Sequence, residues 1–310
     1  MPDYGHDLEF STFPEPRASP PQAAVDAAVL SERWGYDLVS FQDHPYQPGY
    51  LDAWMLMSWV AARTSKIRIA SNVTNMAMRS PAIVAKSAAS IDLLSGGRFD
   101  LGLGAGYFWD AMVTMGVARR TPAESINALG EAVDVIRSIW AGDSGGHSVG
   151  GEHHHVDAAG HGPAPAHRIP LWLGAYKPRM LRLVGAKADG WTATLGVGNI
   201  QTRAQWQAAS DAIDTAAVDA GRNPADIRRL AAVTGDFTGR DGRYLRGAPR
   251  QWVDQLLPSV VEDGVATFIL ATDDHRTLQE FAEEVAPALR DATAAERHTS
   301  SRGPTDGQTN

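Results

Sequence analysis

The sequence contains no cysteine, which excludes a thiol nucleophile, a cysteine-ligated iron–sulfur cluster and a disulfide framework. It has no apolar run of about 18 residues, so we expect neither a membrane-spanning helix nor a membrane partner. The first residues lack a basic segment followed by an apolar one, so no secretory signal is expected. Together these absences favour a cytoplasmic protein.

Positive charge is also scarce. The chain has 28 lysines and arginines against 36 aspartates and glutamates, a formal net charge of −8. The basic residues form no cluster or stripe, which argues against a nucleic-acid partner. Hydrophobic residues make up 44% of the 310 positions, enough for a large buried core and too many for an intrinsically disordered chain.

Short β-prone runs alternate with amphipathic helical patterns along the chain. Strand–helix–strand repeats require parallel pairing with right-handed crossovers. Eight such units in about 290 residues favour an α/β fold of the (β/α)8 TIM-barrel type, with an open doubly wound sheet as the alternative. The expected strands are 8–13, 38–41, 67–72, 99–103, 169–173, 190–194, 230–233 and 268–270. The expected helices are 21–34, 51–63, 81–94, 123–140, 178–187, 203–220, 249–263 and 277–289.

Three segments depart from this rhythm, and one of them, residues 234–248, is rich in Gly, Arg and Asp and is expected to be mobile. Residues 142–167, after the fourth helix, are rich in Gly, His and Pro and predict a small β insertion. Residues 292–310 are polar and predict a disordered tail, so we expect one barrel domain over residues 1–291. The fourth helix begins at Thr121-Pro122-Ala123-Glu124, a capping-box pattern in which the two polar side chains satisfy backbone amides reciprocally.

Polar, glycine and aromatic residues occupy the ends of five consecutive predicted strands. Because the βα loops of a barrel meet at the carboxyl ends of its strands, these residues predict one polar pocket at that face. Glycines in such a place let a ligand lie against the backbone. The segments are 41–46, 70–75, 102–107, 172–179 and 189–194.

Asp43 and His44, after the second predicted strand, are candidates for handling a proton. A carboxylate beside a histidine can hold the imidazole in one tautomer and keep its pKa near the working pH. The alternative interpretation is a histidine that caps a loop or packs under Trp54.

The segment Gly174-Ala175-Tyr176-Lys177-Pro178-Arg179 places two cations at a predicted helix start. Free amide groups and the helix dipole suit a phosphate there, and Lys177 and Arg179 add charge. The alternative is a plain turn whose cations face water. Gly102-x-Gly104-x-Gly106 lacks the spacing of a dinucleotide-binding loop and instead favours close approach of the backbone to a flat ring.

Three consecutive histidines at 153–155 raise the question of a metal ion. In an extended segment they point alternately to opposite faces, so at most two could share one ion. With Glu152 and His161 nearby, we expect a solvated β segment and no metal site. Trp109 is expected at the pocket wall. Four other tryptophans fall on apolar helical faces and are expected in the core: Trp54, Trp59, Trp140 and Trp252.

Two chains of motifs stand out by their order and spacing. The first is Val73-Thr74-Asn75-Met76-Ala77-Met78-Arg79-Ser80-Pro81, continuing through Ala85-Lys86 to Leu93-Leu94-Ser95-Gly96-Gly97-Arg98-Phe99 and Leu101-Gly102-Leu103-Gly104-Ala105-Gly106. The second is Leu173-Gly174-Ala175, through Met180-Leu181, to Ala188-Asp189-Gly190-Trp191. Over about residues 8–290 the chain thereby resembles the luciferase-like monooxygenase superfamily. The resemblance implies a (β/α)8 barrel that binds reduced FMN or the deazaflavin coenzyme F420 at the carboxyl ends of its strands.

The resemblance also implies roles for single residues. Asp43-His44 resembles the pair of the F420-dependent branch, whose histidine lies by the redox ring. Ser71-Asn72-Val73 resembles a third-strand segment that often carries a non-prolyl cis peptide behind that ring. Sugar-phosphate dehydrogenases of that branch have a glutamate acid where this chain has Tyr107, so that acid step does not carry over, and Tyr107 itself is a candidate proton or hydrogen-bond donor. The implied cofactor-binding residues are Asp43, Ser71, Asn72, Val73, Thr74, Gly104, Gly106, Gly174, Ala175 and Lys177.

We therefore expect an oxidoreductase that moves a hydride between the cofactor and a small organic substrate, with His44 as acid/base and Asp43 orienting it. The Asp43-His44 pair favours F420 over FMN. The alternatives are an FMN-dependent monooxygenase that uses O₂, a metal-dependent barrel hydrolase using Asp43, His44 and the histidine run, and a non-catalytic cofactor-binding subunit. The family resemblance implies a homodimer, and a separate flavin or F420 reductase would supply reduced cofactor.

Overall fold

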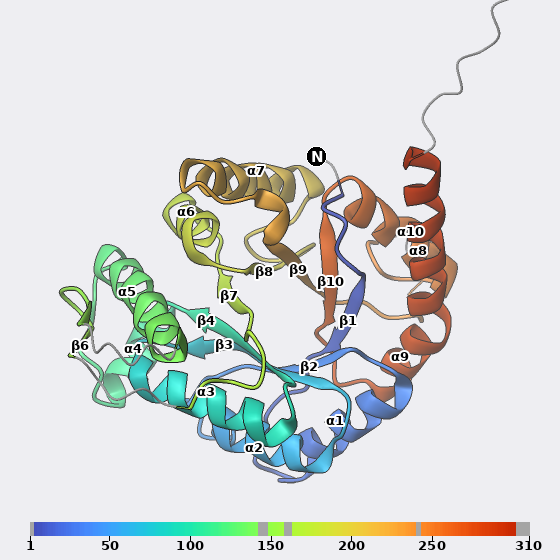
Figure 1. Ribbon diagram of the computed structural model, residues 1–310. Helices are drawn as coiled ribbons and strands as arrows, with labels where there is room; N and C mark the ends of the chain where they lie inside the picture. Colours follow the sequence, from blue (N-terminus) through green and yellow to red (C-terminus); the bar gives the residue numbers. More distant parts are fainter. Residues whose placement is uncertain (1–2, 142–147, 158–162, 240–242, 302–310) are drawn as a thin grey trace, which may run out of the picture.

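Eight parallel strands close into a barrel that is surrounded by helices (Figure 1). The computed structural model describes residues 3–141, 148–157, 163–239 and 243–301. The order around the barrel is β1-β10-β9-β8-β7-β4-β3-β2. The barrel strands are β1 (Glu9–Thr12), β2 (Leu38–Phe41), β3 (Arg68–Asn75), β4 (Phe99–Gly104), β7 (Leu171–Gly174), β8 (Gly190–Thr194), β9 (Arg228–Val233) and β10 (Val265–Leu270). This closure confirms the predicted TIM barrel and excludes the alternative of an open doubly wound sheet.

The helices form the outer layer of the barrel. They are α1 (Ala23–Trp34), α2 (Ala53–Arg63), α3 (Pro81–Ser95), α4 (Trp109–Thr114), α5 (Pro122–Ala141), α6 (Pro178–Lys187), α7 (Arg203–Asp219), α8 (Pro249–Val261), α9 (His275–Glu280) and α10 (Ala286–Ser301). Within the described residues, no helix combines the length and the apolar character needed to cross a bilayer.

Two clusters of buried apolar side chains hold the barrel together. The larger one packs the strands against the helices and includes Phe10, Phe99 and Trp206. The buried members of the second all come from strands, which places them inside the barrel: Leu38, Ala70, Trp172, Leu230, Ala232 and Ile269. Because side chains fill the interior, a ligand has access to the rim of the barrel and not to its centre.

Paired charges occupy the amino-terminal end of the barrel. Arg68 of β3 lies 3.0 Å from Asp100 of β4 and 2.5 Å from Glu9 of β1. Arg228 of β9 lies 3.1 Å from Glu9. Asp100 is fully buried, and this burial raises the pKa of its carboxyl to about 6 even though Arg68 opposes the shift.

Most of the local predictions are confirmed. β2, β8 and α6 have the predicted bounds, and each predicted helix has a counterpart. The amide of Thr121 donates to Glu124 Oε2 at 2.7 Å, and the amide of Glu124 donates to Thr121 Oγ1 at 3.2 Å, which is the predicted capping box. The insertion after α5 contains a two-stranded antiparallel hairpin, β5 (Val149–Gly150) and β6 (His155–Val156).

The start of the predicted disordered tail is wrong. Helix α10 continues to Ser301 instead of ending near residue 291. Thr293 is buried, and Arg297 binds Asp3 near the other end of the chain at 2.5 Å. These contacts with the barrel order a segment whose composition is polar. Residues 302–310, the rest of the predicted tail, lie outside the described residues.

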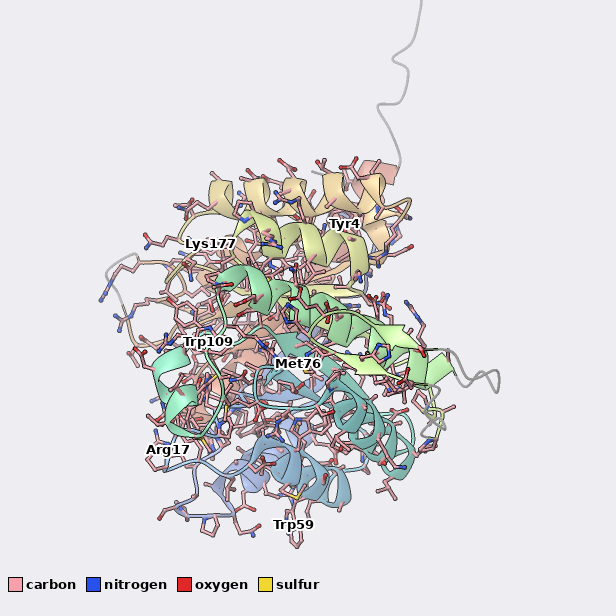
Figure 2. The ribbon with its side chains drawn as sticks, turned by 90° about the vertical axis from the view of Figure 1, so that its left-hand side faces the viewer. Tyr4, Arg17, Trp59, Met76, Trp109 and Lys177 are labelled. Carbon is pink, nitrogen blue, oxygen red and sulfur yellow. The ribbon has the colours of Figure 1, made fainter. Side chains whose placement is uncertain are left out.

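Two further predictions about helices differ from the structure. Trp59 is 54% exposed on α2, with its side chain directed outward in Figure 2. Apolar residues lie on more than one face of α2, and Met55 is exposed as well, so periodicity did not identify the buried face. Trp54 and Trp252 are buried as predicted, and Trp140 is half-buried against the core. Helix α4 was not predicted, because six residues are too few to show a helical period.

Candidate active site

The segments that follow β1, β2, β3, β4 and β7 meet at the carboxyl end of the barrel. All barrel strands run parallel, and β3 and β4 are paired at this end through Asn75 and Gly104. Arg17, Trp109 and Lys177, which follow β1, β4 and β7, lie on one side of the molecule in Figure 2. The fold therefore brings the predicted site segments to one rim, as expected for a barrel enzyme.

Asp43 is buried, and its carboxylate is held by a salt bridge. Arg79 donates to both carboxylate oxygens, from Nε at 2.8 Å and from Nη2 at 2.7 Å, and the amide of Asn75 donates at 3.1 Å. Arg79 also binds Asp52, the N-cap of α2, at 2.7 Å. Asp43 thus ties the loop after β2 to the loop after β3. Within the described residues no hydrogen bond joins this carboxylate to His44, so the role of Asp43 in orienting His44 stays a prediction.

His44 is oriented by a different neighbour. Its Nδ1 shares a short hydrogen bond with the hydroxyl of Tyr46. The edge of the His44 ring contacts Phe108 at a centroid distance of 5.6 Å. Among the described residues Nε2 has no hydrogen-bond partner, so Nε2 is the ring nitrogen left for a ligand.

The environment of His44 favours a neutral imidazole. Burial lowers its pKa below the ordinary value, and the nearby Asp43 carboxylate offsets only part of that effect. Burial also raises the pKa of Tyr46 to about 12, with a contribution from Asp43, so the phenol stays protonated at neutral pH. A neutral imidazole fixed at Nδ1 can give or take a proton at Nε2.

Residues 71–74 of β3 form one wall of the rim. The hydroxyl of Ser71 donates to the carbonyl of Gly102 at 2.8 Å and accepts from its amide at 3.2 Å, so it joins β3 to β4. The Asn72–Val73 peptide is cis, as the resemblance implied. Thr74 is fully buried, and its hydroxyl has no hydrogen-bond partner within the described residues. Ser71 and Thr74 therefore support the wall, while Asn72 and Val73 are the half-buried members.

Val73 lies against glycines of two neighbouring strands. A Cβ added to Gly104 would come within 2.7 Å of a Val73 methyl group, and one added to Gly102 within 3.1 Å. At Gly174 the distance would be 3.6 Å, an ordinary contact. The valine methyl groups and the glycine backbones of β4 and β7 together form a smooth surface, which suits a flat ring. Gly106, just beyond, has a φ of 88°, where glycine is favoured.

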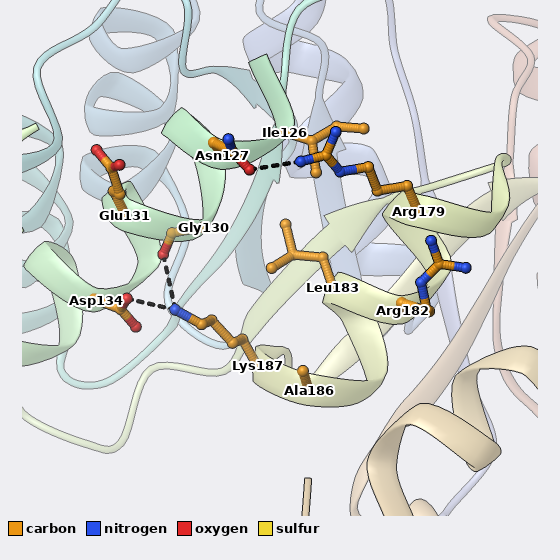
Figure 3. A pocket seen from close by; sticks show the side chains of 10 residues that line it. All are labelled: Ile126, Asn127, Gly130, Glu131, Asp134, Arg179, Arg182, Leu183, Ala186 and Lys187. Atoms are coloured by element: carbon orange, nitrogen blue, oxygen red, sulfur yellow. Dashed lines mark hydrogen bonds and ion pairs between the residues drawn. The ribbon is translucent and has the colours of Figure 1, made fainter. Parts of the chain in front are cut away.

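The start of α6 is a helix N-terminus without a side-chain cap. Lys177 is exposed at the N-cap position and makes no capping hydrogen bond. Arg179 turns away and donates to Asn127 of α5 at 2.8 Å (Figure 3). The amide of Ala175 has a carbonyl partner at 3.4 Å, Thr192. The first-turn amides and Lys177 are therefore the groups here that fit an anionic phosphate.

Tyr107 and Phe108 form an aromatic group beside His44. Tyr107 is 80% exposed and contacts Phe108 edge to face at 5.1 Å between centroids. Phe108 also contacts Tyr46 at 5.9 Å. Tyr107 thus reaches His44 only through Phe108, and its proposed proton donation stays a prediction. Trp109, the first residue of α4, is half-buried as expected for a wall residue.

The sequence reasoning missed three residues that shape this rim: Arg79, Tyr46 and Phe108. Arg79 lies inside the motif at residues 73–81. A buried carboxylate needs a cation, and this requirement was the signal that could have identified Arg79. Tyr46 is two residues after His44 in a turn that the Gln47 amide closes by donating to the His44 carbonyl at 2.9 Å, and this turn brings the phenol to the imidazole. Phe108 carries no sequence signal of its own, because aromatic residues are ordinary in cores.

The histidine run lies elsewhere in the fold. The hairpin follows α5 and packs against that helix in the outer layer of the barrel. The Glu131 carboxylate of α5 accepts hydrogen bonds from the amides of Glu152, His153 and His154 and fixes the hairpin. Within the described residues no group of three or more potential ligands could hold a metal ion, and His161 is outside them.

A cavity of about 460 Å³ lies on the outer layer, between α5 and α6 (Figure 3). Lys187 crosses it to pair with Asp134 and donates to the carbonyl of Gly130 at 3.3 Å. The cavity is lined by two helices and not by strand ends, and Lys187 and Asp134 pair across it. It is therefore a groove between packed helices and separate from the candidate site.

Comparison with known protein families shows the family of the chain. The sequence profile described as luciferase-like monooxygenase matches residues 7–299. The chain belongs to this family. It is 31% identical over 282 residues to the phthiodiolone/phenolphthiodiolone dimycocerosates ketoreductase of Mycobacterium kansasii, covering 81% of this chain and 70% of that protein.

Two other similar proteins are named for coenzyme F420. The F420-dependent glucose-6-phosphate dehydrogenase of Nocardia farcinica is 30% identical over 200 residues, covering 62% of this chain and 59% of that protein. The solved structure of an F420-dependent secondary alcohol dehydrogenase in complex with an F420–acetone adduct has a TM-score of 0.79 at 20% identity, covering 92% of this chain and 100% of that one. At that identity the structural match shows the fold alone.

Proposed function

We propose that this member of the luciferase-like monooxygenase family is an oxidoreductase that uses coenzyme F420 to move a hydride to or from a small organic substrate. The observation that carries the proposal is His44, a neutral imidazole held at Nδ1 by Tyr46 on the rim of the barrel. The F420-named relatives support the choice of cofactor.

The residues of the rim fit this cofactor. The smooth surface of Val73 against the glycine backbones of β4 and β7 would hold the flat ring. Lys177 and the first turn of α6 would hold the phosphate. When bound, the deazaflavin supplies a ring carbon that accepts or donates a hydride. Asp43 and Arg79 fix the loops that carry these residues.

His44 would hold or move the proton that accompanies the hydride. When the neutral imidazole carries its hydrogen on Nε2, it can donate a hydrogen bond to a substrate carbonyl. In the other tautomer, Nε2 can accept a hydrogen bond from an alcohol. General acid–base groups of this kind contribute about 10²–10⁴-fold to a rate.

The matching family is named for monooxygenases, so an FMN-dependent reaction with O₂ is the second candidate. It differs in the cofactor that the rim selects and in the consumption of O₂.

A pair of histidine variants tests the role of His44. In His44→Gln, we expect kcat with F420 to fall about 100-fold or more while the circular dichroism spectrum and Tm are unchanged. His275→Gln, an exposed histidine on α9, is the matched control and should keep full activity. Wild-type kcat in His44→Gln would remove the proposed proton-handling role.

We also propose that the protein works as a homodimer and receives reduced cofactor from a separate reductase. The exposed apolar side chains of α2 and α3 support the dimer, since two copies related by a twofold axis would cover the same face on each other: Met55, Trp59, Ile83 and Leu94. Light scattering during size-exclusion chromatography should give twice the chain mass for the wild type. The Trp59→Ser variant should give a lower mass. A monomeric wild type would contradict the proposal.

A further inference from the structure

The groove between α5 and α6 begins near the rim that carries the candidate site. Both helices follow barrel strands, so they start at the carboxyl end of the barrel and run toward its other end. Arg179 meets Asn127 near the two helix starts. Lys187 meets Asp134 at the far end of the groove. The mouth of the groove therefore lies two residues beyond Lys177, the N-cap residue of α6.

Two arginines without a carboxylate partner line the part of this groove nearest the rim. Arg179 is exposed, and its hydrogen-bond partner in the described part of the chain is a neutral amide, the Oδ1 atom of Asn127 at 2.8 Å. Arg182, one turn further along α6, is exposed and has neither a hydrogen bond nor an ion pair within the described residues. Both guanidinium groups therefore keep N–H donors for an anion, and their planar shape matches a carboxylate.

The two carboxylates that line the groove lie further from the rim, and both already have partners. Asp134 pairs with Lys187. Glu131 accepts hydrogen bonds from three consecutive amides of the β5–β6 hairpin. The mouth of the groove thus keeps an excess of positive charge on a chain whose formal net charge is −8. A local field of opposite sign to the rest of the chain attracts an anionic ligand.

Coenzyme F420 carries an anionic group that matches this position. Beyond its phosphate the molecule continues through a lactyl group into a chain of γ-linked glutamates, whereas FMN ends at its phosphate. An α-helix rises 1.5 Å per residue, so the groove from Arg179 to Lys187 is about 12 Å long. Standard bond lengths give about 6 Å for one extended γ-glutamyl unit, so the groove has the length of about two such units.

We propose that the groove between α5 and α6 binds the oligoglutamate tail of coenzyme F420, with Arg179 and Arg182 as the partners of its carboxylates. The proposal rests on the proposed function, because it requires F420 at the rim, and it adds a binding region on the outer layer of the barrel. The cofactor phosphate lies beside Lys177, and the tail passes from there along α6. This groove distinguishes F420 from FMN, which the surface for the flat ring does not, because both cofactors have a flat ring.

Two forms of the cofactor test this proposal by binding alone, without turnover. Native F420 and F420 trimmed of its glutamates are each titrated into the protein, and the fluorescence of the deazaflavin gives the Kd. An exposed ion pair contributes about two- to fivefold to an affinity, so two pairs should make native F420 bind about tenfold more tightly than the trimmed form at about 20 mM salt. The difference should fall below about threefold at about 0.5 M salt, because salt screens exposed charges.

Variants of the two arginines assign the effect to the groove. Arg182→Gln should raise the Kd of native F420 about threefold, and the double variant Arg179→Gln/Arg182→Gln should raise it about tenfold. Both should leave the Kd of the trimmed form within about twofold. Arg250→Gln is the matched control, because it removes the same charge from an exposed arginine in the first turn of another helix, α8, and it should change neither Kd.

The outcomes separate this inference from the proposed function. If native and trimmed F420 bind with the same Kd, the tail does not contact the protein, and the inference is overturned while the cofactor assignment stands. The same holds if Arg250→Gln weakens the binding of native F420 as much as Arg182→Gln does, because the effect is then one of overall charge. If neither form of F420 binds, the proposed function fails and the tail site falls with it.

Discussion

Replacing Arg79 by methionine would leave the Asp43 carboxylate buried without its cation. The side chain of Asp43 is 1% exposed, and two of its three hydrogen bonds come from Arg79. Removing one partner of a buried pair typically costs about 3–5 kcal/mol. The Arg79 side chain is itself 22% exposed and water can reach its side of the pair, so we expect the lower end, about 3 kcal/mol.

This cost converts into a measurable change in melting temperature. Unfolding entropy of about 2.1 cal/mol/K per residue gives about 0.6 kcal/mol/K for a chain of this length, so Arg79→Met should lower Tm by about 5 °C. Differential scanning calorimetry at pH 7 measures the change. Arg17→Met is the control, because the Arg17–Glu15 pair is exposed and such pairs are worth less than about 1 kcal/mol.

A double variant identifies the cause of the loss. If the unpaired carboxylate is responsible, adding Asp43→Asn to Arg79→Met should restore more than half of the lost Tm, because the buried group is then neutral. A Tm for Arg79→Met within about 1 °C of the Arg17→Met control would refute the reasoning. A double variant no more stable than Arg79→Met would refute it as well.

Three other predictions follow from the same structure. Tyr46→Phe removes the hydrogen bond to His44 and should lower kcat about tenfold with the KM for cofactor unchanged, so a raised KM with normal kcat would contradict the positioning role. Asp100 has a pKa raised from 3.8 to about 6, so its cost in stability is absent below about pH 4, grows as pH rises from 4 to 6 and stays constant above 6; Asp100→Asn should therefore gain Tm over wild type at pH 7–8 and much less at pH 4.5, and an equal change at both would contradict the buried charge. Gly102→Ala would place a Cβ 2.2 Å from the carbonyl oxygen of Ser71, and a loss of about 3 kcal/mol in urea unfolding is expected; wild-type stability would show that the strands can separate without cost.

The barrel could be predicted from the sequence because strand and helix patterns alternate regularly along the chain. Strands at 38–41 and 190–194 are short β-prone runs between helix signals, and both keep their predicted bounds in the structure. Helix α10 was cut short because Thr293 and Arg297 look polar in sequence, while their contacts with the barrel and the N-terminal segment are non-local. Periodicity does not record such contacts.

The position of the site on the barrel could be predicted from the sequence, but the contacts between its side chains could be predicted only in part. Strand ends locate His44, Val73 and Lys177 on one rim, because parallel strands end at one face. The partner of Asp43 was not predicted, since Arg79 is 36 positions away and competes with the adjacent His44 for the carboxylate. Only the three-dimensional geometry decides that competition.

The central claim is that this rim selects coenzyme F420. The most direct measurement is a side-by-side titration of the protein with F420 and with FMN, each oxidised and reduced, followed by cofactor fluorescence or calorimetry. The account predicts saturable binding of F420 and binding of FMN at least about tenfold weaker. Tighter binding of FMN, or no binding of either cofactor, would contradict it.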